Sequence, residues 1–166
     1  MRQVQCFAPV ENANAHLLIL GSMPGEASLR AGQYYAHPRN LFWRIMGELA
    51  GAGPASPYEQ RIQALRSANI ALWDVLHSCS RKGSLDSDID NGSLIANDFA
   101  VFFRRHPKIS HVFFNGVKAE ECFRKFVLPY IETNPIEYLR LPSTSPANAS
   151  IPYERKLEAW RVITKC

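Results

Sequence analysis

The sequence predicts an α/β fold of three layers, in which a central, four-stranded, mostly parallel sheet is flanked by helices. Short apolar runs that suit buried strands alternate along the 166-residue chain with segments of helical periodicity. Such alternation implies right-handed crossovers between parallel strands, with helices on both faces of the sheet. The sequence contains no internal repeat, low-complexity tract or interdomain linker, so residues 1–166 are expected to form one domain.

Four segments have the composition of buried strands. Residues 17–20 form a continuous apolar run that ends at Gly21, as is typical of strands covered on both faces. The second and third strands are predicted over residues 70–73 and 111–114. Residues 136–141 alternate only in part, so the fourth strand is expected nearer an edge of the sheet.

Segments with helical periodicity lie between and after these strands. Their apolar residues recur at spacings of three and four, which places them on one side of a helix. The predicted helices cover residues 41–49, 57–65, 99–105, 122–127 and 152–160. Helices between successive strands are the connections that parallel pairing requires.

The overall composition is that of a globular protein, with 46% hydrophobic and 20% charged residues. No apolar run approaches the ~20 residues needed to cross a bilayer, and the first residues lack the apolar core of a signal peptide. A cytoplasmic protein without a membrane partner is therefore expected. The net charge of +4 permits a polyanionic partner but does not require one.

The four cysteines, Cys6, Cys79, Cys122 and Cys166, are far apart in the sequence. None forms a C-x-x-C pair, so neither a structural zinc site nor a compact iron–sulfur motif is expected. Reduced thiols fit an intracellular protein. Neither a metal nor an organic cofactor is implied.

The strand ends predict where a ligand binds. Ligands of open parallel sheets gather beyond the carboxyl ends of the strands. This rule selects residues 21–40, 74–90, 115–118 and 142–148, all of them rich in polar or turn-forming residues. These segments locate a pocket without identifying its ligand.

Two of these segments carry specific motifs. Gly21-Ser22-Met23-Pro24-Gly25 forms a tight turn with exposed backbone amides, and residues 34–43 read YYAHPRNLFW. The fourth strand runs into residues 141–148, LPSTSPAN. Together and in this order, the motifs resemble the uracil-DNA glycosylase superfamily, in particular its mismatch-specific branch. The resemblance covers nearly the whole chain and implies a uracil-DNA-glycosylase-like fold.

The sequence departs from the superfamily pattern at two positions. Members commonly place Asp or Asn at the position of Met23, and His or Asn at the position of Leu141. This pattern of departures, with Asn40 present, most resembles the hypoxanthine-DNA glycosylase branch, in which the residue corresponding to Asn40 is held to be catalytic. The resemblance implies deoxyinosine in DNA as the substrate.

The resemblance also implies which side chains contact the flipped base. Asn40 would direct water at the anomeric carbon, although an Asn near a helix start also suits capping. Tyr35 would stack on the base, with core packing as the alternative. Asn115 and Asp74 would read the base edge; alternatively, Asn115 forms a turn and Asp74 caps a loop or pairs with a neighbouring cation. Ser22 and Met23 complete the predicted base-binding set.

A second group is expected to contact the DNA backbone. The hydroxyls of Ser143, Thr144 and Ser145 would bind phosphates, and Pro146 to Asn148 would fill the vacated stack. Gly25, His37 and Arg39 complete the predicted DNA-binding set, with hydrogen bonding inside its own loop as the alternative for His37. Arg44, Arg81 and Lys82 are further candidates for phosphate contacts.

The expected reaction is hydrolytic and monofunctional, because no lysine lies within the motifs to act as an amine nucleophile. The expected protein is a monomer that acts on DNA containing deaminated bases. Three alternatives stay open: uracil as the principal substrate, a non-catalytic sensor of damaged or abasic DNA, and an α/β protein that processes nucleosides or nucleotides. Salt dependence of duplex binding distinguishes the DNA-binding alternatives from the last.

Overall fold

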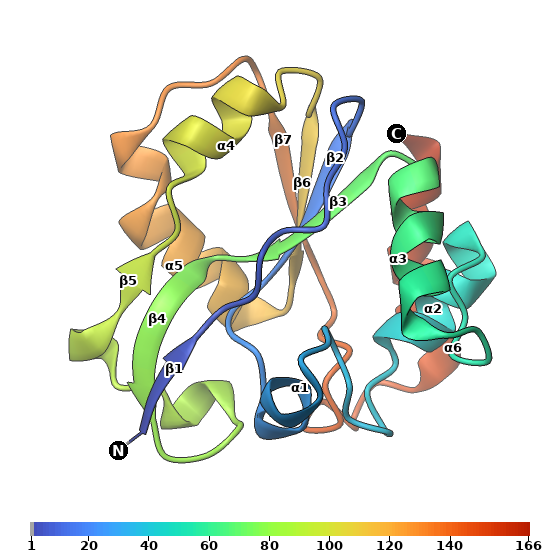
Figure 1. Ribbon diagram of the computed structural model, residues 1–166, viewed down its shortest axis with the longest axis horizontal. Helices are drawn as coiled ribbons and strands as arrows, with labels where there is room; N and C mark the ends of the chain where they lie inside the picture. Colours follow the sequence, from blue (N-terminus) through green and yellow to red (C-terminus); the bar gives the residue numbers. More distant parts are fainter. Residues whose placement is uncertain (1) are drawn as a thin grey trace.

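The computed structural model describes residues 2–166 and has a central sheet of four parallel strands (Figure 1). Its strands are β2 (Leu17–Gly21), β3 (Ile70–Asp74), β6 (His111–Asn115) and β7 (Glu137–Leu141), in the order β3-β2-β6-β7. Every adjacent pair is parallel. The predicted α/β fold with four strands is therefore confirmed, and the partly alternating strand β7 lies at an edge.

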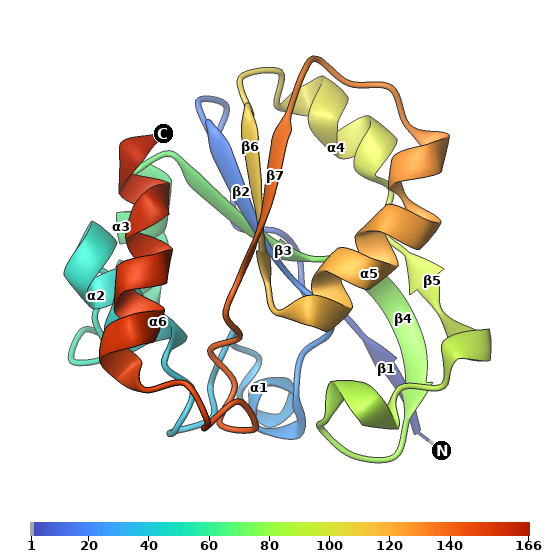
Figure 2. The same cartoon turned by 180° about the vertical axis from the view of Figure 1, so that it is seen from behind.

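Helices cover both faces of this sheet, as Figures 1 and 2 show from opposite sides. One face packs against α2 (Phe42–Ala50), α3 (Tyr58–Ser67) and α6 (Tyr153–Trp160), and the other against α4 (Phe99–Arg105) and α5 (Val117–Phe126). Alternate residues of β2 face opposite layers: Leu17 and Ile19 join the first core, Leu18 and Leu20 the second. A strand covered on both faces needs apolar residues at every position, which explains its continuous apolar run.

A second, antiparallel sheet was not predicted. It consists of β1 (Arg2–Gln5), β4 (Leu76–Arg81) and β5 (Ile95–Ala96), in the order β1-β4-β5. The sequence indicated only a polar strand-end segment after Asp74, yet the chain enters β4 almost at once. Polar and weakly β-forming residues dominate β4, so its conformation depends on backbone pairing with β1 rather than on local propensity.

One short helix also escaped prediction. α1 (Glu26–Ala31) follows the Gly21–Gly25 turn and ends at Gly32, whose φ of 65° is the left-handed conformation that glycine adopts most easily. Short 3-10 helices complete the structure: η1 (Asp86–Asp88), η2 (Asn91–Ser93), η3 (Leu128–Tyr130) and η4 (Arg161–Lys165). Within the described residues, no helix is long and apolar enough to span a membrane.

The strand register brings the predicted segments to one edge of the sheet. Gly21 pairs with Asp74, and Asn115 pairs with Leu141, at the carboxyl ends of their strands. The turn after β2, the start of β4, the end of β6 and the loop after β7 therefore lie together. α1 and the loops around it lie beyond this edge in Figures 1 and 2.

Candidate active site

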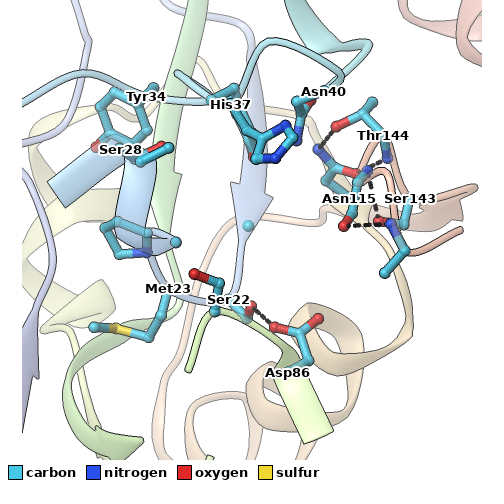
Figure 3. A pocket seen from close by; sticks show the side chains of 18 of the residues that line it. Ser22, Met23, Ser28, Tyr34, His37, Asn40, Asp86, Asn115, Ser143 and Thr144 are labelled. Carbon is cyan, nitrogen blue, oxygen red and sulfur yellow. Dashed lines mark hydrogen bonds between the residues drawn. The ribbon is translucent and has the colours of Figure 1, made fainter. Parts of the chain in front are cut away.

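A cavity of about 270 Å³ opens at this carboxyl edge. The turn after β2 lines it together with residues 143–147 of the loop after β7. Figure 3 shows Met23, Ser28 and Tyr34 on one side, and Asn40, Asn115 and Thr144 on the other. The predicted site residues in its lining are Ser22, Met23, Gly25, Tyr35, His37, Asn40, Asp74, Asn115, Ser143, Thr144, Ser145 and Pro146.

Hydrogen bonds to residues in β4 and on either side of it fix the turn after β2. The Gly21 carbonyl accepts a hydrogen bond from the Val75 amide at 2.8 Å. The Ser22 hydroxyl donates to the carboxylate of Asp86, and the guanidinium of Arg81 donates to the Pro24 carbonyl. The unpredicted strand β4 and the turn that follows it therefore fix the shape of one cavity wall.

Asn115 and Thr144 join the other wall to the sheet. The Asn115 side chain donates from Nδ2 to Thr144 Oγ1 at 3.0 Å and accepts from the Thr144 amide at 2.9 Å (Figure 3). Thr144 is fully buried. The prediction that the Thr144 hydroxyl binds phosphate is therefore wrong, because this hydroxyl is enclosed and paired with Asn115. Asn115 lines the cavity and braces this wall, and the Gly116 amide donates to the Phe114 carbonyl at 3.0 Å in a turn centred on Asn115. The contact of Asn115 with the base stays a prediction.

Further hydrogen bonds hold the loop after β7 along its length. The Leu41 amide donates to the Thr144 carbonyl at 3.0 Å, which links the loop to the start of α2. From α6, Trp160 Nε1 donates to the Pro142 carbonyl at 2.9 Å and Lys156 Nζ to the Asn148 carbonyl at 2.7 Å. The loop is therefore tied to β6, α2 and α6.

Asn40 lies in the cavity wall in a fixed orientation. Its Oδ1 accepts a hydrogen bond from the Phe42 amide at 2.9 Å, so the side chain braces the first turn of α2. A backbone N–H only donates, so the atom that faces it is the amide oxygen. A second lone pair on that oxygen and the Nδ2 group are not used by this contact. The geometry is thus compatible with capping and with a contact to a ligand.

Tyr35 combines an unusual backbone with a packed ring. Its φ of 53° is left-handed, a conformation that bulky residues adopt only where the surroundings impose it. Its ring stacks on Phe42, with centroids 4.2 Å apart and planes inclined by 23°. One face of the ring is therefore covered by the protein. Both Tyr35 and its neighbour Tyr34 line the cavity.

Asp74 is a buried carboxyl group at the end of β3. Its side chain is 3% exposed, and it lines the cavity. Burial raises the pKa of Asp74 to about 7; the nearby negative charge of Asp86 adds to this increase, while the positive charge of Arg81 opposes it. Burial also raises the pKa of the Tyr35 hydroxyl. A carboxyl group with such a pKa is often found at functional sites.

Three residues that were predicted to contact DNA lie outside the lining of the cavity. Arg39 is exposed and outside the lining, and Asn148 faces a second hollow behind the loop after β7. Arg81 is 1% exposed, so its proposed phosphate contact is wrong: the side chain is buried under the Gly21–Gly25 turn. His37 accepts a hydrogen bond from the Arg39 amide at 3.1 Å, which is the alternative given for it.

Sequence reasoning missed part of the lining. Ser84, Leu85 and Asp86 close one side of the cavity, and the Ser84 hydroxyl accepts a hydrogen bond from the Glu26 amide at 2.8 Å. The polar run of residues 84–88 was the only available signal. The strand-end rule placed residues 74–90 near the pocket, but without β4 in the prediction nothing indicated which of them return to the turn after β2.

No cluster of three or more His, Cys, Asp or Glu side chains suited to metal binding occurs between residues 2 and 166. The four cysteines are free thiols, and Cys122 is buried on the core face of α5, as expected for a small apolar residue.

Comparison with known proteins identifies the family. The family model described as the uracil DNA glycosylase superfamily matches residues 8–164. The chain belongs to the uracil DNA glycosylase superfamily. A protein of Methanosarcina acetivorans named hypoxanthine DNA glycosylase is 37% identical over 158 residues, which are 95% of each chain. A protein of the same name from Methanosarcina barkeri is 41% identical over 118 residues, 70% of this chain and 73% of its own.

A solved structure supports the same assignment. The solution NMR structure of a candidate uracil DNA glycosylase from Methanosarcina acetivorans has a TM-score of 0.78 to this protein at 34% identity, covering 99% of this chain and 98% of the other. The two residues that depart from the superfamily pattern, Met23 and Leu141, are buried: Met23 is 8% exposed and Leu141 is 3% exposed. Both pack as core residues, so neither presents a polar group to the cavity.

Proposed function

We propose that the protein is a monofunctional DNA glycosylase that removes a deaminated base, hypoxanthine first and uracil second, from DNA. The observation that carries the proposal is the cavity between the turn after β2 and the loop after β7, with Asn40 in its wall. Its volume of about 270 Å³ lies just below the ~300–1,000 Å³ of pockets for drug-sized ligands, which suits a smaller ligand such as one nucleobase. The two relatives named hypoxanthine DNA glycosylase support the choice of base.

In the proposed reaction, water attacks the anomeric carbon of the flipped nucleotide. A bond forms between the water oxygen and this carbon, and the glycosidic bond breaks with its electron pair passing to the base. The attacking water releases a proton, and the base takes one up, which leaves an abasic site and a free base. Asn40 accepts a hydrogen bond from the water and orients it, because its Oδ1 is already fixed by the Phe42 amide.

Hydrolysis rather than strand cleavage is proposed. Lyase chemistry would need an amine nucleophile, and none of the described residues that line the cavity is a lysine. An amide cannot act as a strong base, so catalysis would depend on positioning and on stabilisation of the departing base.

DNA would approach across the open side of the cavity. Ser143 and Ser145 lie at this side and retain partial exposure, as do His37 and Pro146. We propose that these groups contact the phosphates and that residues 146–148 enter the vacated stack. Arg39 is exposed beside them and adds positive charge. The protein is proposed to act as a single-domain, cytoplasmic monomer.

The test is a panel of duplexes that carry hypoxanthine, uracil, xanthine or a thymine mismatch. Wild type should release free hypoxanthine, and Asn40→Ala should reduce release by about a hundredfold or more, as loss of a positioned polar group does. Asn134→Ala, at an exposed site far from the cavity, serves as the control. If wild type leaves every lesion intact, the proposed activity is wrong. If Asn40→Ala releases base normally, Asn40 has been misassigned.

A non-catalytic sensor of damaged DNA is the second candidate. The buried, apolar Met23 and Leu141 favour it, because both stand where relatives commonly carry polar groups. A sensor would bind lesion-containing duplexes with strong salt dependence and release no base. A protein that processes free nucleosides would bind neither lesion-containing nor undamaged duplexes.

A further inference from the structure

A carboxylate that the sequence analysis did not single out lies at the mouth of the cavity. Asp86, the first residue of η1, is exposed and lines the cavity. Its Oδ1 accepts a hydrogen bond from the hydroxyl of Ser22, a residue that is only 8% exposed. Figure 3 shows this pair on the opposite side of the cavity from Asn40. A buried donor therefore holds an exposed carboxylate at a fixed place in the wall.

The segment that carries Asp86 is itself attached to the structure on both sides of this residue. Before it, the Ser84 hydroxyl accepts a hydrogen bond from the Glu26 amide at 2.8 Å. After it, the Ile89 amide donates to the Asp86 carbonyl at 3.2 Å. The carboxylate is therefore positioned before any ligand enters, which is the condition under which a charge stabilises a transition state without reorganisation.

The depth of the cavity decides which part of a nucleotide meets Asp86. The floor is formed by Gly21, Asp74 and Tyr35, whose atoms lie close together, and Asp74 is 3% exposed. A nucleotide that leaves a duplex enters such a cavity base first, because its sugar stays joined to the DNA backbone outside. The base then occupies the floor, and the sugar lies at the mouth between Asn40 and Asp86.

The proposed reaction gives this sugar a positive charge. As the glycosidic bond breaks, its electron pair passes to the base, and positive charge develops on the anomeric carbon and the ring oxygen. Water bonds to that carbon and releases a proton to the solvent. The amide of Asn40 can orient the water, but it is neutral and cannot balance the charge. Met23, next to Ser22 in the same turn, is apolar and offers no charge either.

We propose that the Asp86 carboxylate, held by Ser22, is a catalytic group that stabilises the cationic sugar while the base departs. It forms no covalent bond and takes up no proton. This inference rests on the proposed glycosylase activity and deepens it by naming the source of the negative charge that the reaction needs at the sugar.

The two other carboxyl groups of the lining fit this role less well. Asp74 lies at the floor, beside the base that becomes negative, rather than beside the sugar. Glu26 is bonded to this region through its backbone amide, so that bond does not orient its carboxylate. Asp86 combines a place at the mouth with a hydrogen bond to the carboxylate itself.

The same charge should have the opposite effect on DNA binding. The phosphates of the incoming strand are negative, so a carboxylate at the mouth repels them before the reaction begins. Removal of the charge should therefore slow the chemical step without weakening binding. A residue that only supports the fold would impair both when it is replaced, so the two roles are distinguished by kcat and KM.

The decisive variant is Asp86→Asn, because its amide oxygen still accepts from Ser22 while the charge is lost. Its kcat for hypoxanthine release should fall about a hundredfold, and its KM should stay the same or decrease. Asp88→Asn is the matched control: it makes the same charge change outside the lining, and its amide oxygen can still accept from the Leu85 amide, so kcat should not change. An Asp86→Asn protein with the wild-type kcat overturns the proposal, as does one in which only KM rises.

Ser22→Ala tests the anchor. Without the Ser22 hydroxyl the carboxylate keeps its charge but loses its fixed position, so kcat should fall about tenfold. In the double variant Ser22→Ala with Asp86→Asn, kcat should be no lower than in Asp86→Asn alone, because the two residues act as one unit. Losses that simply multiply would show that Ser22 acts independently of Asp86 and would contradict this part of the proposal.

Binding to a charged sugar analogue separates this inference from the proposed function. Duplexes carry, in place of the damaged nucleotide, either a pyrrolidine ring, which is protonated at neutral pH, or a neutral tetrahydrofuran ring. Wild type should bind the pyrrolidine duplex about tenfold more tightly. Asp86→Asn should lose this preference and bind the tetrahydrofuran duplex at least as tightly as wild type does. A variant that keeps the preference, or that binds neither duplex, overturns the proposal.

The two proposals can then fail separately. If wild type releases no base but prefers the pyrrolidine duplex through Asp86, only the glycosylase proposal fails. If base is released but the preference is absent or does not depend on Asp86, only the role of Asp86 is wrong.

Discussion

Replacing Thr144 by Val tests whether the brace between β6 and the loop after β7 stabilises the fold. Val has nearly the same shape, so the change removes the hydroxyl that accepts from Asn115 Nδ2 at 3.0 Å and leaves the backbone contact at 2.9 Å in place. A buried donor without a partner costs about 1–3 kcal/mol. The added buried methyl group returns about 0.8 kcal/mol. The net loss in the free energy of unfolding should therefore be about 0.2–2.2 kcal/mol.

Urea unfolding of wild type and Thr144→Val measures this difference directly. A loss of this size lowers the melting temperature by about 2–4 °C for each kcal/mol in a protein of this length. The control is Thr164→Val, since Thr164 is exposed and its substitution should change stability by less than about 0.5 kcal/mol. If Thr144→Val is as stable as wild type, the contact contributes nothing and the loop is held by its other bonds.

Three further substitutions probe the same region. Gly21→Ala places a methyl group 2.6 Å from Asp74 Oδ1, so it should cost about 1–3 kcal/mol of stability by overpacking and reduce base release more than tenfold; a normal rate would show that the floor of the cavity is not used. The pKa of Asp74 lies at about 7, above its ordinary value of 3.8, so the folded protein holds a proton that the unfolded chain has released between these values. Wild-type stability relative to Asp74→Asn should therefore fall by on the order of 1.4 kcal/mol per pH unit from about pH 4 to 7 and then level off, and a constant difference in urea unfolding would contradict this. Lys156→Met removes the donor to the Asn148 carbonyl and should make residues 142–151 more susceptible to limited proteolysis, with a change of less than about 4 °C in melting temperature; unchanged proteolysis would show that Lys156 does not hold the loop.

The central sheet could be predicted because its signals are local. Residues 17–20 are apolar at every position, and such a run identifies a strand covered on both faces without reference to other segments. The rule that ligands gather at the carboxyl ends of parallel strands then selected segments that the structure brings to one cavity. The hydrophobic pattern and the strand-end rule were therefore sufficient to predict that the segments containing Asn40 and Asp74 line one cavity.

The second sheet could not be predicted, because its signals are not local. The residues of β4 are largely polar, and pairing with β1, more than 70 positions earlier, determines that they form a strand. The contact between Ser22 and Asp86 depends on that strand and was missed with it. The role of Thr144 failed for a related reason: a hydroxyl in a Ser- and Pro-rich loop looks accessible in sequence, and only tertiary packing encloses it.

The ties between α6 and the loop after β7 have a consequence for the energetics of DNA binding. Trp160 and Lys156 fix the loop at both ends, through the carbonyls of Pro142 and Asn148. A free loop would lose conformational entropy each time it entered the duplex, and that loss would weaken every encounter. Here the ordering takes place once, during folding. The protein would then search DNA with a loop whose conformation is already fixed. Discrimination between damaged and normal base pairs would depend on how readily each base pair opens.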